Sequence, residues 1–187
     1  MNKTVKWIAT TAIIAAIYVV LTVVLHPLSF GMIQIRFAEG LMILICFNKK
    51  YSFALIIGCL IANLFSFLFL DFIFGTLATV IACILMMLVK NKYIAWIFPV
   101  IANGIIVGIE LYYFGEPLVL SMLSVAAGEA IAVLLGLLVF VLLDKNPYIH
   151  KLITSEDDKK TVVVKKNRRS LNITTKESET LKNRSLK

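Results

Sequence analysis

The stretch from Leu118 to Leu143 reads LVLSMLSVAAGEAIAVLLGLLVFVLL and contains one charged side chain, that of Glu129. About 20 consecutive apolar residues are enough for an α-helix to cross the hydrocarbon core of a bilayer. A stretch of this length and apolarity therefore predicts a membrane-spanning helix. The whole chain agrees, because 60% of its 187 residues are hydrophobic, whereas soluble domains are roughly 45–50% apolar.

Further apolar stretches precede this one, and short polar or proline-containing segments separate them. The predicted helices comprise residues 7–25, 33–47, 51–70, 72–89, 93–113 and 118–143. The second is shorter than a spanning helix, so we expect it to enter obliquely or to be shielded by its neighbours, since unpaired backbone groups cannot face lipid. The sequence therefore predicts an all-α integral membrane protein, in which residues 1–146 form a six-helix transmembrane bundle with a short second helix.

Basic side chains mark alternate ends of the predicted helices. They are Lys3, Lys6, Lys49, Lys50, Lys90 and Lys92, followed by the basic residues after Asp144. Lys and Arg are enriched in the cytoplasmic loops of membrane proteins. The opposite ends carry Asp71 and Glu116 and no lysine. This alternation predicts a multi-pass protein of the cell membrane, with both termini in the cytoplasm and with Asp71 and Glu116 outside.

The C-terminal segment, residues 147–187, differs from the rest in composition. Between residues 144 and 187 there are twelve Lys/Arg and six Asp/Glu, whereas the preceding chain has seven and five. The net charge of +8 therefore resides mostly in this part of the chain. Polar, charged segments bury too little apolar surface to fold, so we expect a basic, disordered cytoplasmic tail. Aromatic side chains do not interleave with its charges as base stacking requires, so nucleic acid is not an expected partner.

Polar side chains within membrane helices are costly, and each calls for a reason. Those in the predicted helices are Arg36, Glu39, Asn63, Asn103, Glu110 and Glu129, with Asp71 at a helix boundary. A rise of about 1.5 Å per residue places this set between the midplane and the outer surface. One arginine accompanies the carboxylates, which favours a cationic or donor-rich ligand. We expect a pocket open to the outside; the alternative is that these charges only pair with one another and join helices.

Small residues recur at four-residue spacing in three of the predicted helices. They are Gly104 with Gly108, Gly128 with Ala132 and Gly136, and Ala12 with Ala16. Small residues at this spacing let neighbouring backbones approach closely, so we expect close helix packing at the two glycine-containing stripes. Ala12 and Ala16 are compatible with internal packing or with docking of another membrane subunit.

Motifs typical of enzymes are missing from the sequence. It has no GxxxxGK[ST] loop, no HExxH and no GxSxG, and its histidines are His26 and His150. Cys46, Cys59 and Cys83 lie in apolar stretches without CxxC spacing, which favours buried thiols over disulfide or metal roles. We therefore predict no enzyme activity, no catalytic residue, no cofactor and no metal. Any uphill transport must draw on an ion gradient or on a partner that supplies ATP.

Several segments resemble the QueT family, in the same order along the chain. They are Ile33–Leu41 (IQIRFAEGL, with the pattern Q-x-R-x-x-E-x-L), Gly58–Leu64 (GCLIANL), Asp71–Thr79 (DFIFGTLAT), Asn103–Leu111 (NGIIVGIEL) and Gly128–Ala130 (GEA). The resemblance covers about Trp7 to Leu143, which includes all six predicted helices, and does not extend to the charged tail.

The resemblance implies that the chain is a substrate-binding S component of an energy-coupling factor (ECF) transporter. Such subunits capture micronutrients at the outer face, and a transmembrane coupling protein with two ATPase subunits drives release inside. In this family the implied substrate is a queuosine precursor, a 7-deazaguanine such as preQ1 or preQ0. Alanines on the first helix of S components contact the coupling protein, so the resemblance assigns partner docking to Ala12 and Ala16.

The polar residues within the predicted helices suit this chemistry. A carboxylate can accept hydrogen bonds from N1–H and the exocyclic amine of a deazaguanine, and a second carboxylate can pair with the ammonium of the aminomethyl form. The expected substrate-binding residues are Arg36, Glu39, Asn63, Asp71, Asn103, Glu110 and Glu129. Three alternatives stay open: an S component for a different vitamin, an autonomous proton-coupled carrier with Glu129 or Glu110 as the proton site, and a structural or assembly protein with paired internal charges.

Overall fold

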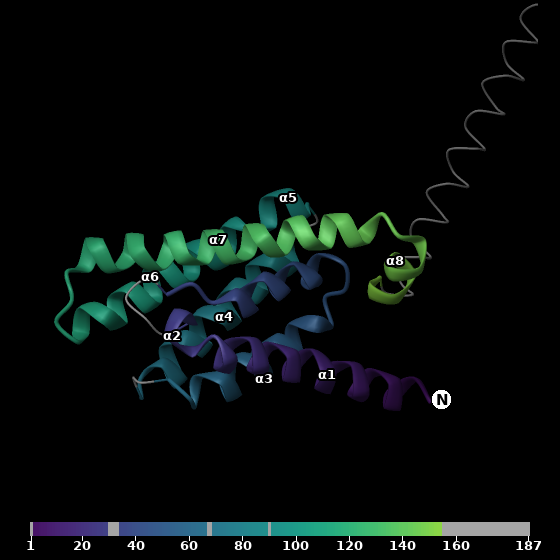
Figure 1. Cartoon of the computed structure of the whole chain (residues 1–187), viewed down its shortest axis with the longest axis horizontal. Helices are drawn as coiled ribbons and strands as arrows, with labels where there is room; N and C mark the ends of the chain where they lie inside the picture. Colours follow the sequence, from purple (N-terminus) through teal and green to yellow (C-terminus); the bar gives the residue numbers. More distant parts are fainter. Residues whose placement is uncertain (1, 30–33, 67–68, 90, 155–187) are drawn as a thin grey trace, which may run out of the picture.

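The computed structural model of the chain describes residues 2–29, 34–66, 69–89 and 91–154 (Figure 1). Within these ranges every regular element is a helix. In chain order they are α1 (Lys3–Val24), α2 (His26–Ser29), η1 (Phe37–Cys46), α3 (Tyr51–Asn63), α4 (Asp71–Leu88), α5 (Lys92–Ala95), α6 (Ile97–Tyr113), α7 (Leu118–Asp144) and α8 (Pro147–Ile153). The predicted all-α class is confirmed for this part of the chain.

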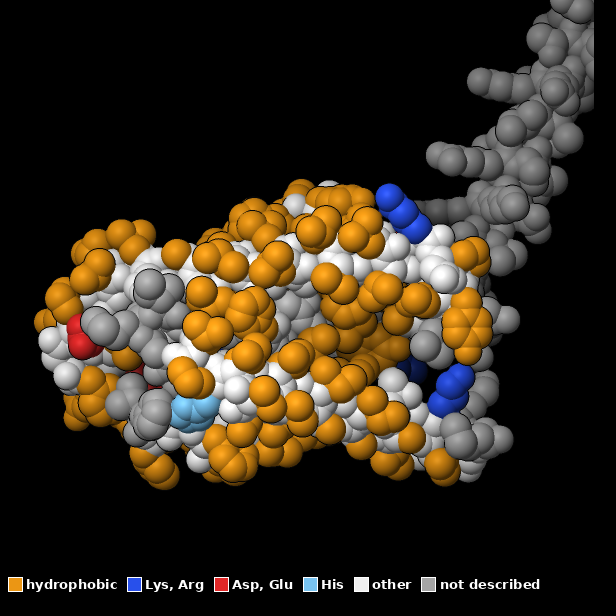
Figure 2. Space-filling view, in the orientation of Figure 1, with side chains coloured by type: hydrophobic (Ala, Val, Ile, Leu, Met, Phe, Trp, Pro, Cys, Tyr) orange, Lys and Arg blue, Asp and Glu red, His pale blue; other side chains and the backbone are white. Residues whose placement is uncertain are grey.

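Four helical segments are long and apolar enough to cross a membrane. They are α1, α4, α5 together with α6, and α7, whereas η1 and α3 are apolar but shorter. Figure 2 shows hydrophobic side chains along the length of the molecule and charged side chains towards its two ends. Soluble monomers rarely expose so large an apolar surface. The chain is therefore a multi-pass membrane protein, while the number of six spans stays a prediction.

The longer helices pack against one another in an order that follows the chain. Helix α1 packs on α3, α3 on α4, α4 on α6, and α6 on α7. The segment η1 contacts α1, α3, α4 and α7, and so lies in the interior of the bundle. The two ends of the series, α1 and α7, are thus joined through η1. This interior position places the polar residues at the start of η1 among those of the surrounding helices.

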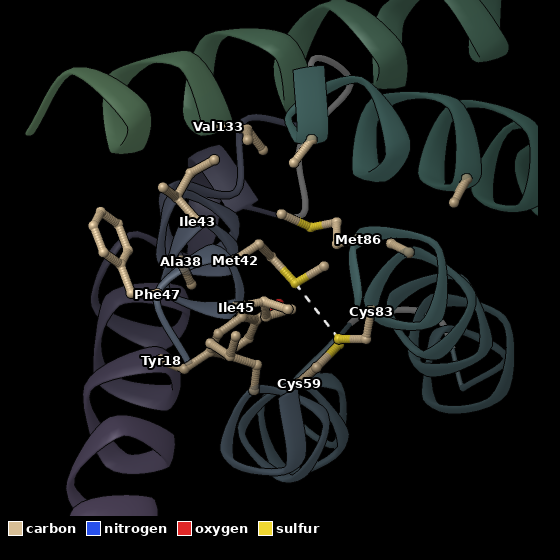
Figure 3. Packing of buried hydrophobic residues seen from close by; sticks show 14 of the residues in the cluster. Tyr18, Ala38, Met42, Ile43, Ile45, Phe47, Cys59, Cys83, Met86 and Val133 are labelled. Carbon is tan, nitrogen blue, oxygen red and sulfur yellow. Dashed lines mark hydrogen bonds between the residues drawn. The ribbon is translucent and has the colours of Figure 1, made fainter. Parts of the chain in front are cut away.

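The apolar core surrounds η1. Met42 of η1 is fully buried beside Cys83 of α4, whose Sγ lies 3.9 Å from Met42 Sδ (Figure 3). Tyr18 of α1 and Ile43 of η1 belong to the same cluster of buried residues. The core therefore holds η1 from several sides, and each side belongs to a different helix.

The second predicted helix, residues 33–47, is a 3-10 helix rather than an α-helix, and its first residue lies outside the described ranges. A 3-10 helix rises about 2.0 Å per residue, against about 1.5 Å in an α-helix. Ten residues of η1 thus extend about 20 Å, which an α-helix reaches with about 13. The tighter winding also gives a narrower backbone that fits against α7. A Cβ atom on Gly136 would lie 2.2 Å from the carbonyl oxygen of Gly40, so two glycines make this contact possible.

Two further predicted boundaries are wrong. The helix predicted over 51–70 ends at Asn63, where the next amides bond to carbonyls three residues back and tighten the chain into a turn. The helix predicted over 93–113 is divided into α5 and α6. Pro99 has no N–H to donate to the carbonyl of Ala95, and the first of these two helices ends at Ala95.

The beginning of the predicted tail is also helical. Asn146 caps α8 by accepting a hydrogen bond from the amide of Tyr148, and Pro147 occupies the first turn, where a missing N–H costs nothing. Asp144, at the end of α7, lies 2.7 Å from Lys92 Nζ and 2.6 Å from His150 Nδ1. These contacts join α8 to α5 and α7. The rest of the predicted tail, residues 155–187, lies outside the described ranges.

Candidate functional site

The seven predicted site residues are all buried, with at most 3% of each exposed. Arg36 and Glu39 lie at the start of η1, Asn63 at the end of α3, Asp71 at the start of α4, Asn103 and Glu110 on α6, and Glu129 on α7. Four carboxylates are therefore buried in the described part of the chain, and Arg36 is the one buried Lys or Arg there. Because η1, α3, α4, α6 and α7 each contribute one or two of these groups, only the folded bundle brings them together.

Glu39 is held by a residue that sequence reasoning missed. The hydroxyl of Tyr18, on α1, donates a hydrogen bond to Glu39 Oε1, and both residues are fully buried. Glu39 Oε2 is buried and has no hydrogen-bond partner within the described residues. Tyr18 thus holds one oxygen of the carboxylate, and the other oxygen can accept a hydrogen bond from a ligand. Ala15 and Thr22, three and four residues away on the same face of α1, are also buried.

Asn63 and Arg36 meet at a glycine of α4. A Cβ atom on Gly75 would lie 2.9 Å from Asn63 Nδ2 and 3.7 Å from Arg36 Nη1. The amide of Asn63 also lies 3.3 Å from Thr76 Oγ1 and 3.3 Å from Cys59 Sγ, while its Oδ1 is buried without a partner in the described structure. Gly75 therefore leaves the space in which the amide and the guanidinium approach each other.

Asp71 and Glu110 bring two carboxyl groups together from α4 and α6. Ser66 Oγ donates a hydrogen bond to Asp71 Oδ2. The two carboxyl groups lie close enough to interact directly, and Arg36 acts on both electrostatically. Asp71 Oδ1 and both oxygens of Glu110 are buried without hydrogen-bond partners among the described residues. This pair is the part of the site with the most acceptor capacity left over.

The remaining two residues complete the cluster from α7 and α6. Glu129 interacts electrostatically with Glu39 and Arg36, and its Oε2 is buried without a partner in the described ranges. Asn103 lies seven residues before Glu110, which places both on one face of α6. The Oδ1 and Nδ2 atoms of Asn103 are both buried and unpartnered there. Asn103 therefore makes no side-chain hydrogen bond to the other six within the described part of the chain.

The arrangement is costly for a folded protein on its own. A buried polar atom without a hydrogen bond costs about 1–3 kcal/mol, and charged groups cost more. The described residues hold several such atoms in one region, and most of them are acceptors. Such a region suits a small ligand that brings donors and positive charge, because the ligand satisfies groups that the protein leaves unpaired.

The two residues predicted to dock a partner have the exposure that this role needs. Ala12 and Ala16 are exposed on α1, whereas Ala15 and Tyr18 on the same helix are buried. The main-chain oxygen of Ala15 would lie 3.1 Å from a Cβ atom on Gly58 of α3. Helix α1 thus turns one small-residue face to α3 and leaves the other uncovered.

Comparisons with known proteins agree with the organisation described above. Residues 8–145 match the model of a family described as the QueT transporter. Over 88 residues the chain is 43% identical to the queuosine precursor transporter QueT of Lactococcus lactis subsp. cremoris (strain MG1363). The matched stretch covers 46% of this chain and 52% of that relative, so it spans about half the length of each. No solved structure matches the chain.

Proposed function

This chain belongs to the QueT transporter family, a family of transporters and not of enzymes, and we propose that it captures a queuosine precursor at the outer face of the cell membrane. In this proposal the ligand is a 7-deazaguanine such as preQ1 or preQ0, in line with the name of the Lactococcus relative. The chain acts as the S component of an ECF transporter, which takes its energy from ATPase partners.

One observation carries the substrate proposal. Four buried carboxylates surround a single buried arginine in the described structure, and each of the four has at least one oxygen without a hydrogen-bond partner there. A 7-deazaguanine presents N1–H and an exocyclic amine on one edge, and Glu39 Oε2 is an acceptor for such donors. Arg36 and the two buried asparagines offer donors to its carbonyl oxygen. Loss of one such charge-assisted contact should cost about 1.5–3 kcal/mol.

The charges at the two ends of the bundle support the proposed orientation. The turn that joins α6 to α7 carries Glu116, whereas the opposite end carries Lys49 and Lys50 beside the start of α3. By the preference of basic residues for the cytoplasmic side, the N-terminus and α8 lie inside. Asp71 and Glu110, near the other end of their helices, then face the outer half, from which a nutrient arrives.

The partner proposal rests on a missing ATP-binding motif and on an exposed face of helix α1. Its sequence contains no GxxxxGK[ST] loop, so a transport cycle driven by ATP needs another subunit. The exposed small-residue face of α1 at Ala12 and Ala16 offers a surface on which a membrane helix can approach closely. We assign this face to the transmembrane coupling protein.

Binding to the purified protein tests the substrate proposal. Isothermal titration in detergent should detect preQ1 or preQ0 and should detect neither biotin nor riboflavin, which stand for the vitamins of other S components. Glu39→Gln should weaken binding by at least about tenfold, as one charge-assisted hydrogen bond predicts. Binding of a vitamin with no response to a deazaguanine would overturn the substrate proposal.

Uptake by cells tests the energy source. Cells that produce this chain with a coupling protein and two ATPases should accumulate labelled preQ1, and an ATPase variant that cannot hydrolyse ATP should not. The competing function is a proton-coupled carrier, which the buried carboxyl pair of Asp71 and Glu110 favours. A carrier of that kind would retain uptake without the ATPases and would lose it when a protonophore collapses the proton gradient.

A further inference from the structure

The four buried carboxylates do not have equivalent surroundings. Tyr18 donates to Glu39, and Glu129 interacts with Arg36 and Glu39. Asp71 and Glu110 instead lie against each other, from the start of α4 and the end of α6. Ser66 donates a hydrogen bond to Asp71 Oδ2. The pair therefore forms a separate, more acidic part of the site.

The charge around this pair is poorly balanced. Arg36 acts on Asp71 and Glu110, but it also acts on Glu39 and Glu129. One guanidinium thus serves four carboxylates. Two carboxylates in contact repel each other unless a proton or another cation lies between them. A ligand that carries a positive charge to this position would remove that repulsion.

The free acceptors define what kind of cation fits. Three of the four carboxyl oxygens of the pair, namely Asp71 Oδ1 and both oxygens of Glu110, are buried without a partner in the described ranges. A primary ammonium group has three N–H donors, so the numbers of donors and free acceptors match. Asn103, whose amide atoms are also buried and unpartnered, shares a face of α6 with Glu110 about 10 Å away along the helix axis. A small ligand with an ammonium arm and a hydrogen-bonding ring can therefore engage both.

A metal ion fits this position less well. Within the described residues no group of three His, Cys, Asp or Glu side chains is placed to hold one. Ca²⁺ requires six to eight oxygen ligands, and Mg²⁺ requires octahedral geometry. The neighbouring guanidinium of Arg36 also repels a divalent ion. An ammonium needs only the hydrogen-bond acceptors that are already there.

We propose that Asp71 and Glu110 form a subsite for a primary ammonium group, so that this protein binds the aminomethyl form of its 7-deazaguanine ligand in preference to uncharged forms. The inference rests on the proposed function, because it names the part of the ligand that this pair contacts. It adds a division of roles. Glu39 accepts hydrogen bonds from the edge of the ring, which the charged and uncharged ligands share. Asp71 and Glu110 bind the substituent in which these ligands differ.

Two ligands with the same ring test the subsite. The purified full-length protein is titrated with preQ1, which carries the aminomethyl group, and with preQ0, which carries an uncharged nitrile. The wild type should bind preQ1 at least about tenfold more tightly, as one charge-assisted hydrogen bond predicts. Asp71→Asn and Glu110→Gln should each reduce preQ1 binding by about 10- to 100-fold and leave preQ0 binding within about twofold. Glu39→Gln should reduce the binding of both ligands.

The controls separate failure of this inference from failure of the proposed function. Asp144 is the last residue of α7, and its carboxylate pairs with Lys92 and His150, away from Asp71 and Glu110. Asp144→Asn should therefore leave the binding of both ligands unchanged. Equal losses for preQ1 and preQ0 in the Asp71 and Glu110 variants, or equal affinity of the wild type for both, would overturn the subsite and leave the function intact. A folded wild type that binds neither ligand would overturn the function itself.

A measurement on the ligand covers the case in which the variants do not fold. N-acetylated preQ1 has the same ring and arm but no positive charge and one N–H on the substituent nitrogen. The wild type should bind it at least about tenfold more weakly than preQ1. Guanine, which has no ammonium group, should bind about as weakly as the acetylated ligand. Undiminished binding of the acetylated ligand would contradict an ammonium subsite without the need for any substitution.

Discussion

At the scale of single residues, the hydroxyl of Tyr18 is the group whose removal is most informative. Glu39 is fully buried, and Tyr18→Phe removes the hydroxyl that donates a hydrogen bond to its Oε1. An unsatisfied buried acceptor costs about 1–3 kcal/mol, so we expect the thermal unfolding midpoint to fall and preQ1 affinity to drop by about tenfold, since the carboxylate is no longer oriented. Tyr148→Phe, at an exposed tyrosine, is the matched control. Equal behaviour of the two variants would show that the Tyr18 hydroxyl has no such role.

Gly75 tests how closely the site is packed. A Cβ atom there would lie 2.9 Å from Asn63 Nδ2, so Gly75→Ala should displace the Asn63 side chain and lower stability, although alanine favours a helix more than glycine does. Asn63→Ala removes the obstructing amide. In the double variant the two effects should therefore be less than additive by at least about 0.5 kcal/mol, in unfolding measurements on all four proteins. Strict additivity would mean that the two residues do not meet.

At the scale of elements, the contact between η1 and α7 allows a ranked prediction. In Gly136→Ala the new methyl would meet the backbone of Gly40 at 2.2 Å, and two backbones have to separate. We expect a loss of about 3 kcal/mol, the upper end of the usual cost of overpacking, seen as a lower unfolding midpoint. Gly104→Ala is the control, because its Cβ would lie 3.0 Å from the Ala126 side chain, where a small shift relieves the contact. Its stability should change by less than about 1 kcal/mol.

Helix α1 offers a pair of adjacent alanines with opposite surroundings. Ala16→Trp places a large side chain on the exposed face, so it should abolish co-purification with a coupling protein and uptake, while preQ1 binding to the isolated subunit stays within about twofold. Ala15→Trp changes the buried neighbour that packs towards Gly58, and overpacking of this kind should destabilise the subunit itself. If Ala16→Trp also abolishes ligand binding, the face belongs to internal packing.

These elements also show which features of the structure could be predicted from the sequence. Apolar length alone predicted the long helices, and polar side chains in apolar stretches pointed to seven residues that the fold does bury, although their contact with substrate stays a prediction. The 3-10 form of η1 was not predictable, because it depends on Gly40 meeting Gly136 across the bundle. Tyr18 was missed since a tyrosine in an apolar helix is ordinary, and only its partner Glu39 makes it polar in function.

At the scale of the whole molecule, the orientation in the membrane can be tested directly. Cysteine is introduced at Glu116 or at Lys49, both exposed at opposite ends of the bundle, in a background with Cys46→Ser. Cys59 and Cys83 are buried and free. An impermeant thiol reagent added to intact cells should label the cysteine at position 116 and not the one at 49. Labelling of position 49 alone would reverse the proposed topology.

The 3-10 winding of η1 has a consequence for how this protein can change over evolution. Successive residues turn by about 120°, so every third side chain points the same way: the row that begins at Glu39 continues to Met42, and the row that begins at Gly40 continues to Ile43. Insertion of one residue before Glu39 would shift each row by 120° and move this carboxylate into the row of Gly40, which faces α7. Relatives should therefore tolerate length changes in η1 only in steps of three, whereas insertions should be tolerated more readily in the exposed turn at Gly115.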